Sequence, residues 1–294
     1  MDKIHIPVLL EESLKLLDIK SDDFYIDCTL GDGGHSYKIL SRLSSQGLLL
    51  SIDRDQNSID FVEQYYQIPS NWIIKQGNFA DLKQILKNIE ITRQANGILM
   101  DLGLSSRQIE ESHNRGFSYQ ESLESLDMRM DTNLTVSALD LLKGLTEQEL
   151  VKLFKVYGEE RYAKLIAKEI KKNISKIETV GDLTSLIYKV VPVASNNRNP
   201  SRRVFQALRI AVNDEINNLK KGLDEAFEIL STNGKLAVIS FHSLEDRTIK
   251  DFFNRKADEK AGEVLSKNPI QPTQKEIERN PRSSSAKLRI LRKI

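Results

Sequence analysis

The stretch DCTLGDGGHS, residues 27–36, places three glycines within four positions, between an aspartate and a histidine. Glycine tolerates positive φ and lets a ligand approach the backbone because it has no Cβ. A short hydrophobic run precedes the stretch and a helix-like pattern follows it. A tight strand-to-helix turn would need only one glycine, so the pattern favours a ligand loop at the end of a strand.

Two common phosphate-binding patterns do not fit this loop. A P-loop requires a lysine after its last glycine, and none follows Gly34. The dinucleotide fingerprint requires a third glycine where this chain has Ser36. Asp27, Gly31 and Gly33 instead follow an acid-x-x-x-Gly-x-Gly spacing, which resembles motif I of the S-adenosylmethionine-dependent methyltransferases.

The next three expected strands also end in residues that could contact a nucleoside. Asp53 stands 20 residues after Gly33, where a carboxylate can accept the hydroxyls of an adenosine ribose. The same side chain could cap the following helix, and both roles can hold together. Phe79 could lie against an adenine ring or pack at a helix start. The fourth strand ends at Asp101.

Apolar runs alternate with helical patterns before Asp101. Strands are expected at 24–30, 48–53, 71–77 and 96–103. Short, nearly continuous apolar strands between helices are typical of a parallel sheet covered on both faces. We therefore expect a doubly wound α/β sheet with right-handed crossovers. Ligands of such sheets bind at the carboxyl ends of the strands, where the candidate residues stand.

Helical patterns replace the strands from about residue 104 to residue 199. Thr146 with Glu149 forms a capping-box signature in this segment. An amphipathic helix is expected over 212–230, and strands return at 234–241 and 286–294. The helical segment is too long for a loop. We expect a discontinuous domain, residues 1–103 plus 200–294, interrupted by a helical substrate-recognition domain, residues 104–199.

Composition excludes several classes of protein. The chain has 294 residues, 39% hydrophobic and 29% charged, as in a globular protein with a sizeable core. No apolar run approaches the roughly 20 residues of a membrane span, and the N-terminus does not resemble a secretory signal. The one cysteine, Cys28, excludes an internal disulfide and a multi-cysteine zinc site. We expect a cytoplasmic protein and assign no metal ligand.

Positive charge is concentrated in two segments, although the net charge is only +1. Residues 198–209 hold four arginines and no acid, and residues 281–294 hold five basic residues and no acid. One such block can be solvated surface, but two favour a site for a polyanion. We expect the outward-facing members of the first block to contact RNA phosphates: Arg198, Arg202, Arg203 and Arg209.

Eight motifs extend these observations over nearly the whole chain, from about His5 to Arg289. They are HIPVLLEE, DCTLGDGGHS, DLGLSSRQ, RGFSY, LDMRMD, RRVFQALRIAVNDE, SFHSLEDR and NPRSSSAKLR, in this order. Together they resemble the bacterial 16S ribosomal RNA cytosine-N4 methyltransferases, the RsmH or MraW family. The resemblance implies a class I S-adenosylmethionine-dependent methyltransferase (Rossmann-like) sheet with a helical insertion. It also implies S-adenosylmethionine as methyl donor and cytosine 1402 of the 16S rRNA decoding region as acceptor.

The resemblance further implies roles for single residues. Those expected to bind the cofactor are Gly33, Gly34, His35, Asp53, Phe79, Asp101 and Gln108. From its own position at the end of the fourth strand, and not from the resemblance, Asp101 is also expected to lie nearest the transferring methyl group. His242 could face the substrate base or simply pack, and Ser243 with Asp246 is expected to form a capping box for the next helix.

Two other classes of function remain open. An NAD-dependent oxidoreductase would share the ribose contact of Asp53, but the third glycine and a hydride-transfer constellation are missing. A non-catalytic ribosome assembly or RNA-binding factor could keep a methyltransferase fold. The sequence also leaves open whether the substrate is naked rRNA or an assembled small ribosomal subunit, whether a metal ion assists, and whether the protein is a homodimer.

Overall fold

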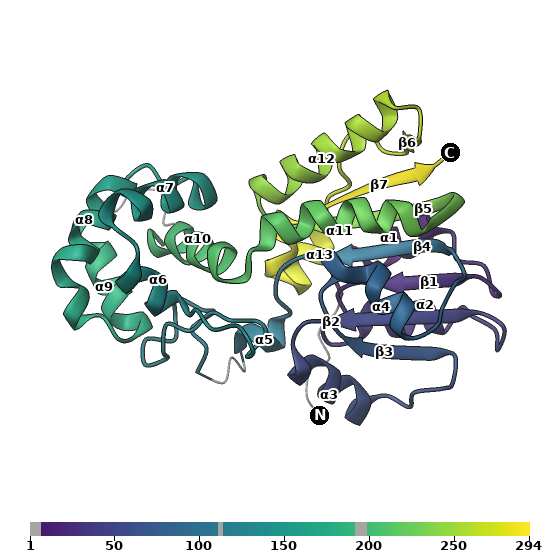
Figure 1. Ribbon diagram of the computed structural model, residues 1–294, viewed down its shortest axis with the longest axis horizontal. Coiled ribbons are helices and arrows are strands. Elements are labelled where there is room, and N and C mark those ends of the chain that lie inside the picture. Colours follow the sequence, from purple (N-terminus) through teal and green to yellow (C-terminus); the bar gives the residue numbers. More distant parts are fainter. Residues whose placement is uncertain (1–6, 111–113, 192–198) are drawn as a thin grey trace. The chain divides into compact units, whose positions relative to one another are not determined.

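The chain folds into two compact units in the computed structural model, residues 1–105 with 216–294 and residues 106–215 (Figure 1). The structure describes residues 7–110, 114–191 and 199–294. The second unit is thus inserted in the chain of the first.

The first unit contains a seven-stranded sheet in the order β3-β2-β1-β4-β5-β7-β6. Its strands are β1 (Phe24–Asp27), β2 (Leu48–Asp53), β3 (Trp72–Gln76), β4 (Ala95–Asp101), β5 (Leu230–Ser240), β6 (Gly262–Val264) and β7 (Lys287–Lys293). β1 to β5 pair in parallel, and β7 runs antiparallel between β5 and β6. The expected doubly wound, Rossmann-like sheet is thereby confirmed, with the antiparallel β7 and the short β6 added beyond β5.

Helices cover both faces of this sheet. The helices of this unit are α1 (Leu10–Leu17), α2 (Gly34–Leu40), α3 (Gln56–Tyr65), η1 (Phe79–Asp81), α4 (Leu82–Asn88), α11 (Glu215–Ile229), α12 (Ser243–Asp258), α13 (Gln274–Arg279) and η3 (Pro281–Ser285). Successive residues of a strand point to opposite faces. Accordingly Phe24 and Ile26 enter a core with α4, α11 and α12, whereas Tyr25 enters a second core with α1, α2 and α3.

The second unit is helical, as the patterns predict. Its elements are α5 (Ser106–Glu110), α6 (Ala138–Gly144), α7 (Glu147–Gly158), α8 (Ala163–Asn173), η2 (Ile174–Lys176), α9 (Val180–Val190) and α10 (Ser201–Asn213). Capping boxes begin α6, α7 and α9, and the predicted box of Thr146 and Glu149 is the one on α7. Over the whole described chain, no helix combines the length and apolar character needed to cross a membrane.

The second unit extends further along the chain than the expected boundary at residue 199. α10 belongs to it because Val204, Phe205 and Leu208 are buried in its core. The amphipathic helix expected over 212–230 is confirmed as α11, but its start is wrong, because Val212 belongs to α10. Asp214 adopts a left-handed conformation, with φ of 49°, and separates α10 from α11.

Candidate active site

The loop between β1 and α2 is held in place by Asp53. Its Oδ2 accepts a hydrogen bond from the backbone N–H of Gly31 at 2.8 Å, and its Oδ1 accepts one from that of Asp55 at 2.9 Å. Gly33 has φ of 79°, and a Cβ there would lie 2.9 Å from Cε2 of Tyr66. Position 33 therefore requires glycine for its backbone conformation and for space.

The first turn of α2 lies under the segment that precedes α1. A Cβ on Gly34 would collide with the Pro7 ring. The buried His35 ring places Nε2 3.2 Å from the carbonyl oxygen of Val8. Both motif residues are thus fixed by the same covering segment.

Buried hydroxyl groups position Asp27 beneath the loop. Trp72 Nε1 donates to Ser51 Oγ at 2.8 Å, the hydroxyls of Ser51 and Ser36 are 2.8 Å apart, and Ser36 donates to Asp27 Oδ2 at 2.6 Å. Each hydroxyl has one proton to donate, so the three donors point in sequence toward the carboxylate. Burial raises the pKa of Asp27 to about 7, against the lowering effect of hydrogen bonds from Ser36 and Thr29.

Asp101, the last residue of β4, has a buried Oδ1 with no hydrogen-bond partner among the described residues. Its Oδ2 lies 3.6 Å from Nδ1 of His35, and its backbone N–H donates to Thr29 Oγ1 at 2.7 Å. Burial raises the pKa of Asp101 well above the usual range, and the nearby charges of Asp27 and Glu245 raise it further. An unpartnered buried oxygen of this kind can accept a hydrogen bond from a ligand.

Asp53 keeps capacity for a ligand despite its two backbone contacts. Each carboxylate oxygen can accept a second hydrogen bond. Burial raises the pKa of Asp53 to about 6, and hydrogen bonds from the N–H groups of Asp55 and Gly31 oppose that rise. The contact with a ribose stays a prediction that this geometry permits.

Phe79 and Gln108 come from different units of the chain. Phe79, on η1, packs against the core beneath α11, and its ring fills the space that a Cβ on Gly222 would occupy. Core packing thus accounts for part of the ring, and the contact with adenine stays a prediction. Gln108 lies on α5 of the second unit, and its cofactor role stays a prediction.

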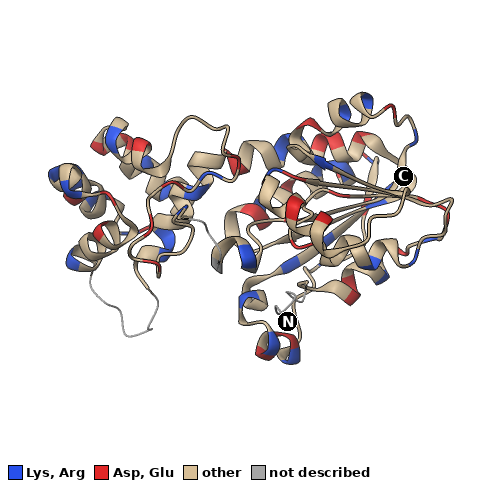
Figure 2. Cartoon of the chain, turned by 90° about the horizontal axis from the view of Figure 1, so that it is seen from below, with Lys and Arg blue, Asp and Glu red and all other residues tan. Residues whose placement is uncertain are grey.

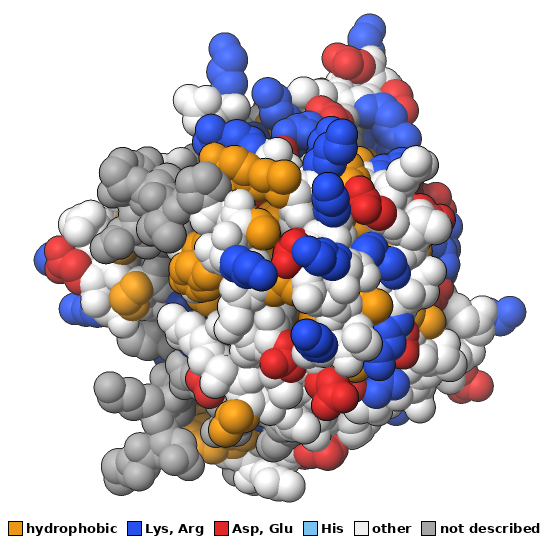
Figure 3. Space-filling view, turned by 90° about the vertical axis from the view of Figure 1, so that its left-hand side faces the viewer, with side chains coloured by type: hydrophobic (Ala, Val, Ile, Leu, Met, Phe, Trp, Pro, Cys, Tyr) orange, Lys and Arg blue, Asp and Glu red, His pale blue; other side chains and the backbone are white. Residues whose placement is uncertain are grey.

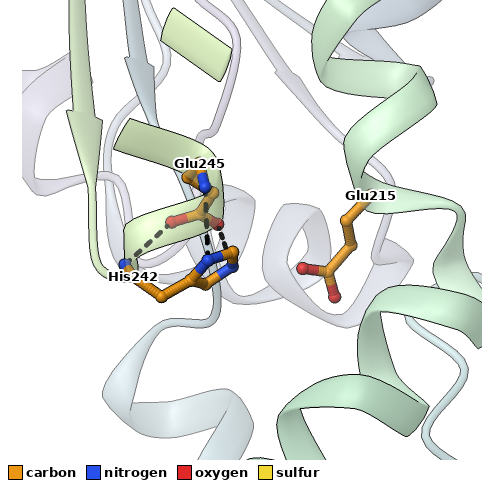
Figure 4. Close-up of side chains that lie close together, drawn as sticks. All are labelled: Glu215, His242 and Glu245. Atoms are coloured by element: carbon orange, nitrogen blue, oxygen red, sulfur yellow. Dashed lines mark hydrogen bonds and ion pairs between the residues drawn. The ribbon is translucent and has the colours of Figure 1, made fainter. Parts of the chain in front are cut away.

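His242, and not Ser243, caps α12. His242 Nδ1 accepts from the backbone N–H of Glu245 at 3.3 Å, and the Glu245 carboxylate accepts from that of His242 at 3.3 Å. His242 Nε2 lies 3.1 Å from Glu245 Oε1 (Figure 4). The predicted box of Ser243 and Asp246 is therefore wrong. The structure gives His242 a capping role, and its contact with the substrate base stays a prediction.

The basic block at the end of the chain forms internal contacts. Arg289 Nε and Lys287 Nζ donate to the two Asp246 oxygens at 2.7 and 2.9 Å. Arg292 pairs with Glu263, and Lys293 Nζ donates to backbone carbonyls at the end of α11 and the start of β5. These four side chains fasten β7 to its neighbours, so four of the five basic residues of the block are engaged within the first unit.

The predicted RNA-binding arginines also differ in their surroundings. Arg209 holds the Glu215 carboxylate through Nε and Nη2 at 2.8 and 3.0 Å. Arg203 donates to the carbonyl oxygen of Glu159 at 3.1 Å. Arg202 is exposed, and no hydrogen bond or ion pair joins its side chain to a described residue. Arg198 lies outside the described residues.

Two residues of the site, Ser51 and Glu245, are recognisable from the sequence although they are not among the predicted site residues. Ser51 interrupts the apolar strand β2, and a buried hydroxyl needs a partner, which Trp72 and Ser36 supply. Glu245 follows His242 at capping-box spacing. Thr29 gave no such signal, because its hydrogen bond with Asp101 joins positions far apart in the chain.

Comparison with known proteins decides the family. The family model described as the MraW methylase family matches residues 2–294. The chain belongs to the MraW methylase family. The ribosomal RNA small subunit methyltransferase H of Caldicellulosiruptor saccharolyticus is 44% identical over 307 residues, with 99% of each chain covered. The protein of that name in Fusobacterium nucleatum is 41% identical over 316 residues, covering 100% of this chain and 99% of the other.

Solved structures give a weaker likeness. An rRNA methylase from Streptococcus thermophilus shares 10% identity with a TM-score of 0.46, covering 100% of this chain and 99% of that one. The resemblance recognised in the eight motifs is confirmed by the family match and by the curated relatives.

Proposed function

We propose that this MraW family protein transfers the methyl group of S-adenosyl-L-methionine to the N4 amine of cytosine 1402 in 16S rRNA. The relatives named as small-subunit rRNA methyltransferases support rRNA of the small subunit as substrate. The observation that carries the chemistry is the buried, unpartnered Oδ1 of Asp101 beside the glycine loop. A cytoplasmic location without a membrane partner goes with this substrate.

The residues around the loop fit S-adenosylmethionine. Gly33 allows the positive φ with which the loop turns into α2. Asp53 can accept ribose hydroxyls, and the carboxylate of Asp101 can lie near the positively charged sulfur. When bound, this cofactor supplies an activated methyl group on a positively charged sulfur. Because a nearby positive charge favours the ionised carboxyl, cofactor bound beside Asp101 would lower the raised pKa of this side chain.

The acceptor nitrogen is a weak nucleophile, whereas the methyl donor is already activated. The lone pair of the N4 amine is delocalised into the pyrimidine ring, so the protein contributes by holding the amine in line and excluding water. Asp101 Oδ1 accepts a hydrogen bond from the amine, which turns the lone pair toward the methyl donor, and takes the released proton. His35 positions Asp101, because its Nδ1 lies 3.6 Å from Oδ2 and leaves Oδ1 for the amine.

The target cytosine must leave its stack to reach this group, as in other enzymes that modify a base. Capture of an unstacked base combined with phosphate contacts is the usual mode of RNA recognition. We assign the phosphate contacts to the helical second unit, in keeping with the substrate-recognition role proposed for it.

One experiment tests the proposal against its alternatives. The protein is incubated with labelled S-adenosylmethionine and under-methylated small ribosomal subunits, and the digested RNA is analysed by mass spectrometry. N4-methylcytidine at position 1402 is the expected product. Label on another base contradicts the assigned substrate, whereas cofactor binding without transfer supports a non-catalytic assembly factor. Reduction of NAD in place of transfer would support an oxidoreductase.

A further inference from the structure

Three lysines form a row along one side of α8 in the second unit. Lys164, Lys168 and Lys172 follow one another at intervals of four residues, which places them on one face of the helix. All three are exposed, and the partly exposed Leu165 lies beside them in the chain. Figure 2 shows basic residues on the helices of this unit, and Figure 3 shows Lys and Arg side chains on one of its faces.

The polar residues on either side of this row form hydrogen bonds or ion pairs within the unit, whereas no such contact joins the three lysines of the row to a described residue. Glu169 accepts from Asn173 Nδ2 at 2.9 Å and lies 3.4 Å from Lys189 Nζ. Lys171 Nζ donates to two backbone carbonyls at the end of α6. The three lysines of the row form no ion pair with any residue in the described part of the chain.

Local helix energetics do not account for the row. Like charges four residues apart on a helix destabilise it, and Glu169, the only acid on α8, is turned toward other partners. Lys164 stands in the first turn, where the helix dipole disfavours a positive charge. Only Lys172, in the last turn, is in a favourable place. An external anion along the row would relieve both the repulsion and the unfavourable end effect.

We infer that Lys164, Lys168 and Lys172 form a docking surface for the phosphate backbone of RNA. At a rise of 1.5 Å per residue the row extends about 12 Å along the helix, enough to meet successive phosphates of one strand. Charge complementarity identifies the occupant. The inference rests on the proposed function, since small-subunit rRNA is the polyanion that the protein must hold. It places the phosphate contacts on α8, whereas Arg203 and Arg209 of the predicted arginine block bind within the unit.

Charge reversal in the full-length protein tests this surface. The triple variant K164E/K168E/K172E is compared with K15E/K87E/K267E, which makes the same change in net charge at exposed positions of the first unit. Affinity for in vitro transcribed small-subunit rRNA is measured over a series of salt concentrations. We expect the α8 variant to bind at least tenfold more weakly. The slope of log affinity against log salt should fall by about 2, since each phosphate contact with a single strand contributes about 0.7.

Three results would overturn the inference. They are an unchanged RNA affinity and salt slope in the α8 variant, equal losses of RNA affinity in the two variants, and tighter binding of polyglutamate than of RNA by the unaltered protein. Affinity for S-adenosylmethionine and the circular dichroism spectrum should stay unchanged in both variants. Failure of the unaltered protein to methylate under-methylated subunits counts against the proposed function instead, so the two failures are distinguishable.

Discussion

Asp101 Oδ2 lies 3.6 Å from His35 Nδ1, while Nε2 of the same ring lies 3.2 Å from the carbonyl oxygen of Val8. A carbonyl oxygen can only accept, so Nε2 carries a proton and Nδ1 of a neutral ring is an acceptor. Any hydrogen bond between the two side chains then requires either a protonated Asp101 or a cationic His35. Because burial raises the pKa of Asp101, we expect the proton on Asp101 until a positive ligand arrives.

Asp101→Asn tests this assignment because asparagine has the shape of the protonated acid but cannot take a proton. We expect single-turnover methyl transfer to slow by about 10²–10⁴-fold, the usual contribution of a general base. The urea midpoint should change little. Asp251→Asn, at an exposed position of α12, is the control and should keep full activity. An Asp101→Asn protein with normal turnover and normal cofactor affinity would remove Asp101 from the mechanism.

Cofactor affinity should depend on pH. The pKa of Asp53 is raised to about 6 and that of Asp101 is raised further. Both carboxyls therefore hold protons in the free protein more readily than ordinary carboxyls do. A hydrogen bond from a ribose hydroxyl to Asp53 and a positive sulfur beside Asp101 would favour the ionised forms. Binding releases protons, so affinity should rise with pH, by up to about tenfold per unit below pH 6 for each group. Calorimetry in buffers of different ionisation enthalpy measures the release. Affinity that is equal at about pH 5.5 and about pH 8 would contradict this linkage.

Gly33→Ala should damage the cofactor loop. The left-handed backbone costs about 1–2 kcal/mol with a Cβ, and the added methyl would press on Tyr66 and Val62. We expect a lower urea midpoint and at least tenfold weaker cofactor binding. Gly144→Ala is the matched control, because a Cβ at this end of α6 meets nothing within 4 Å. Similar effects from both substitutions would show that the loop does not need glycine at position 33.

Asp246→Asn should destabilise the junction of α12 and β7. Burial alone would raise the pKa of Asp246, but hydrogen bonds from Arg289 and Lys287 bring it below the usual range. A lowered pKa in the folded state stabilises the protein above the unfolded value of about 3.9 and loses this effect as pH falls through the folded value. We expect a loss of about 2 kcal/mol near pH 7, shrinking below about pH 4, as measured by urea unfolding.

Glu263→Gln provides the comparison for this last variant. Glu263 on β6 pairs with Arg292 on the neighbouring β7, but both side chains are about half exposed. Surface pairs of this kind contribute less than about 1 kcal/mol. Equal losses in the two variants would mean that burial of Asp246 adds nothing to its ion pairs.

The parallel strands could be predicted because each is a buried run between helical patterns. β6 could not, since three residues show no period. The break between α10 and α11 at Asp214 could not be predicted, because the apolar spacing continues across it. At α12 the chain offers His242 with Glu245 and Ser243 with Asp246 at the same spacing. Serine is the better cap by propensity, but Asp246 is drawn to distant partners on β7.

The contacts of the basic segment at the end of the chain could not be predicted from the sequence either. Its sequence contains no acid, so it resembles a free cationic surface. The acids that neutralise it, Asp246 and Glu263, come from α12 and β6 and meet it only in the folded sheet. The cofactor loop could be located because its residues are contiguous. The hydrogen bond from the backbone N–H of Asp101 to Thr29, which directly follows β1, could not be predicted because the two residues lie 72 positions apart.

β4 and β5 are neighbours in the sheet, although residues 102–229 separate them in the chain. During synthesis the edge of β4 therefore stays unpaired while residues 102–229 are made. This takes on the order of ten seconds at about 5–20 residues per second. An unpaired strand edge invites pairing with other chains. A helical unit that folds first would bring the two strand ends together and shorten the loop to be closed. The insertion thus governs how long the nascent protein is exposed to aggregation.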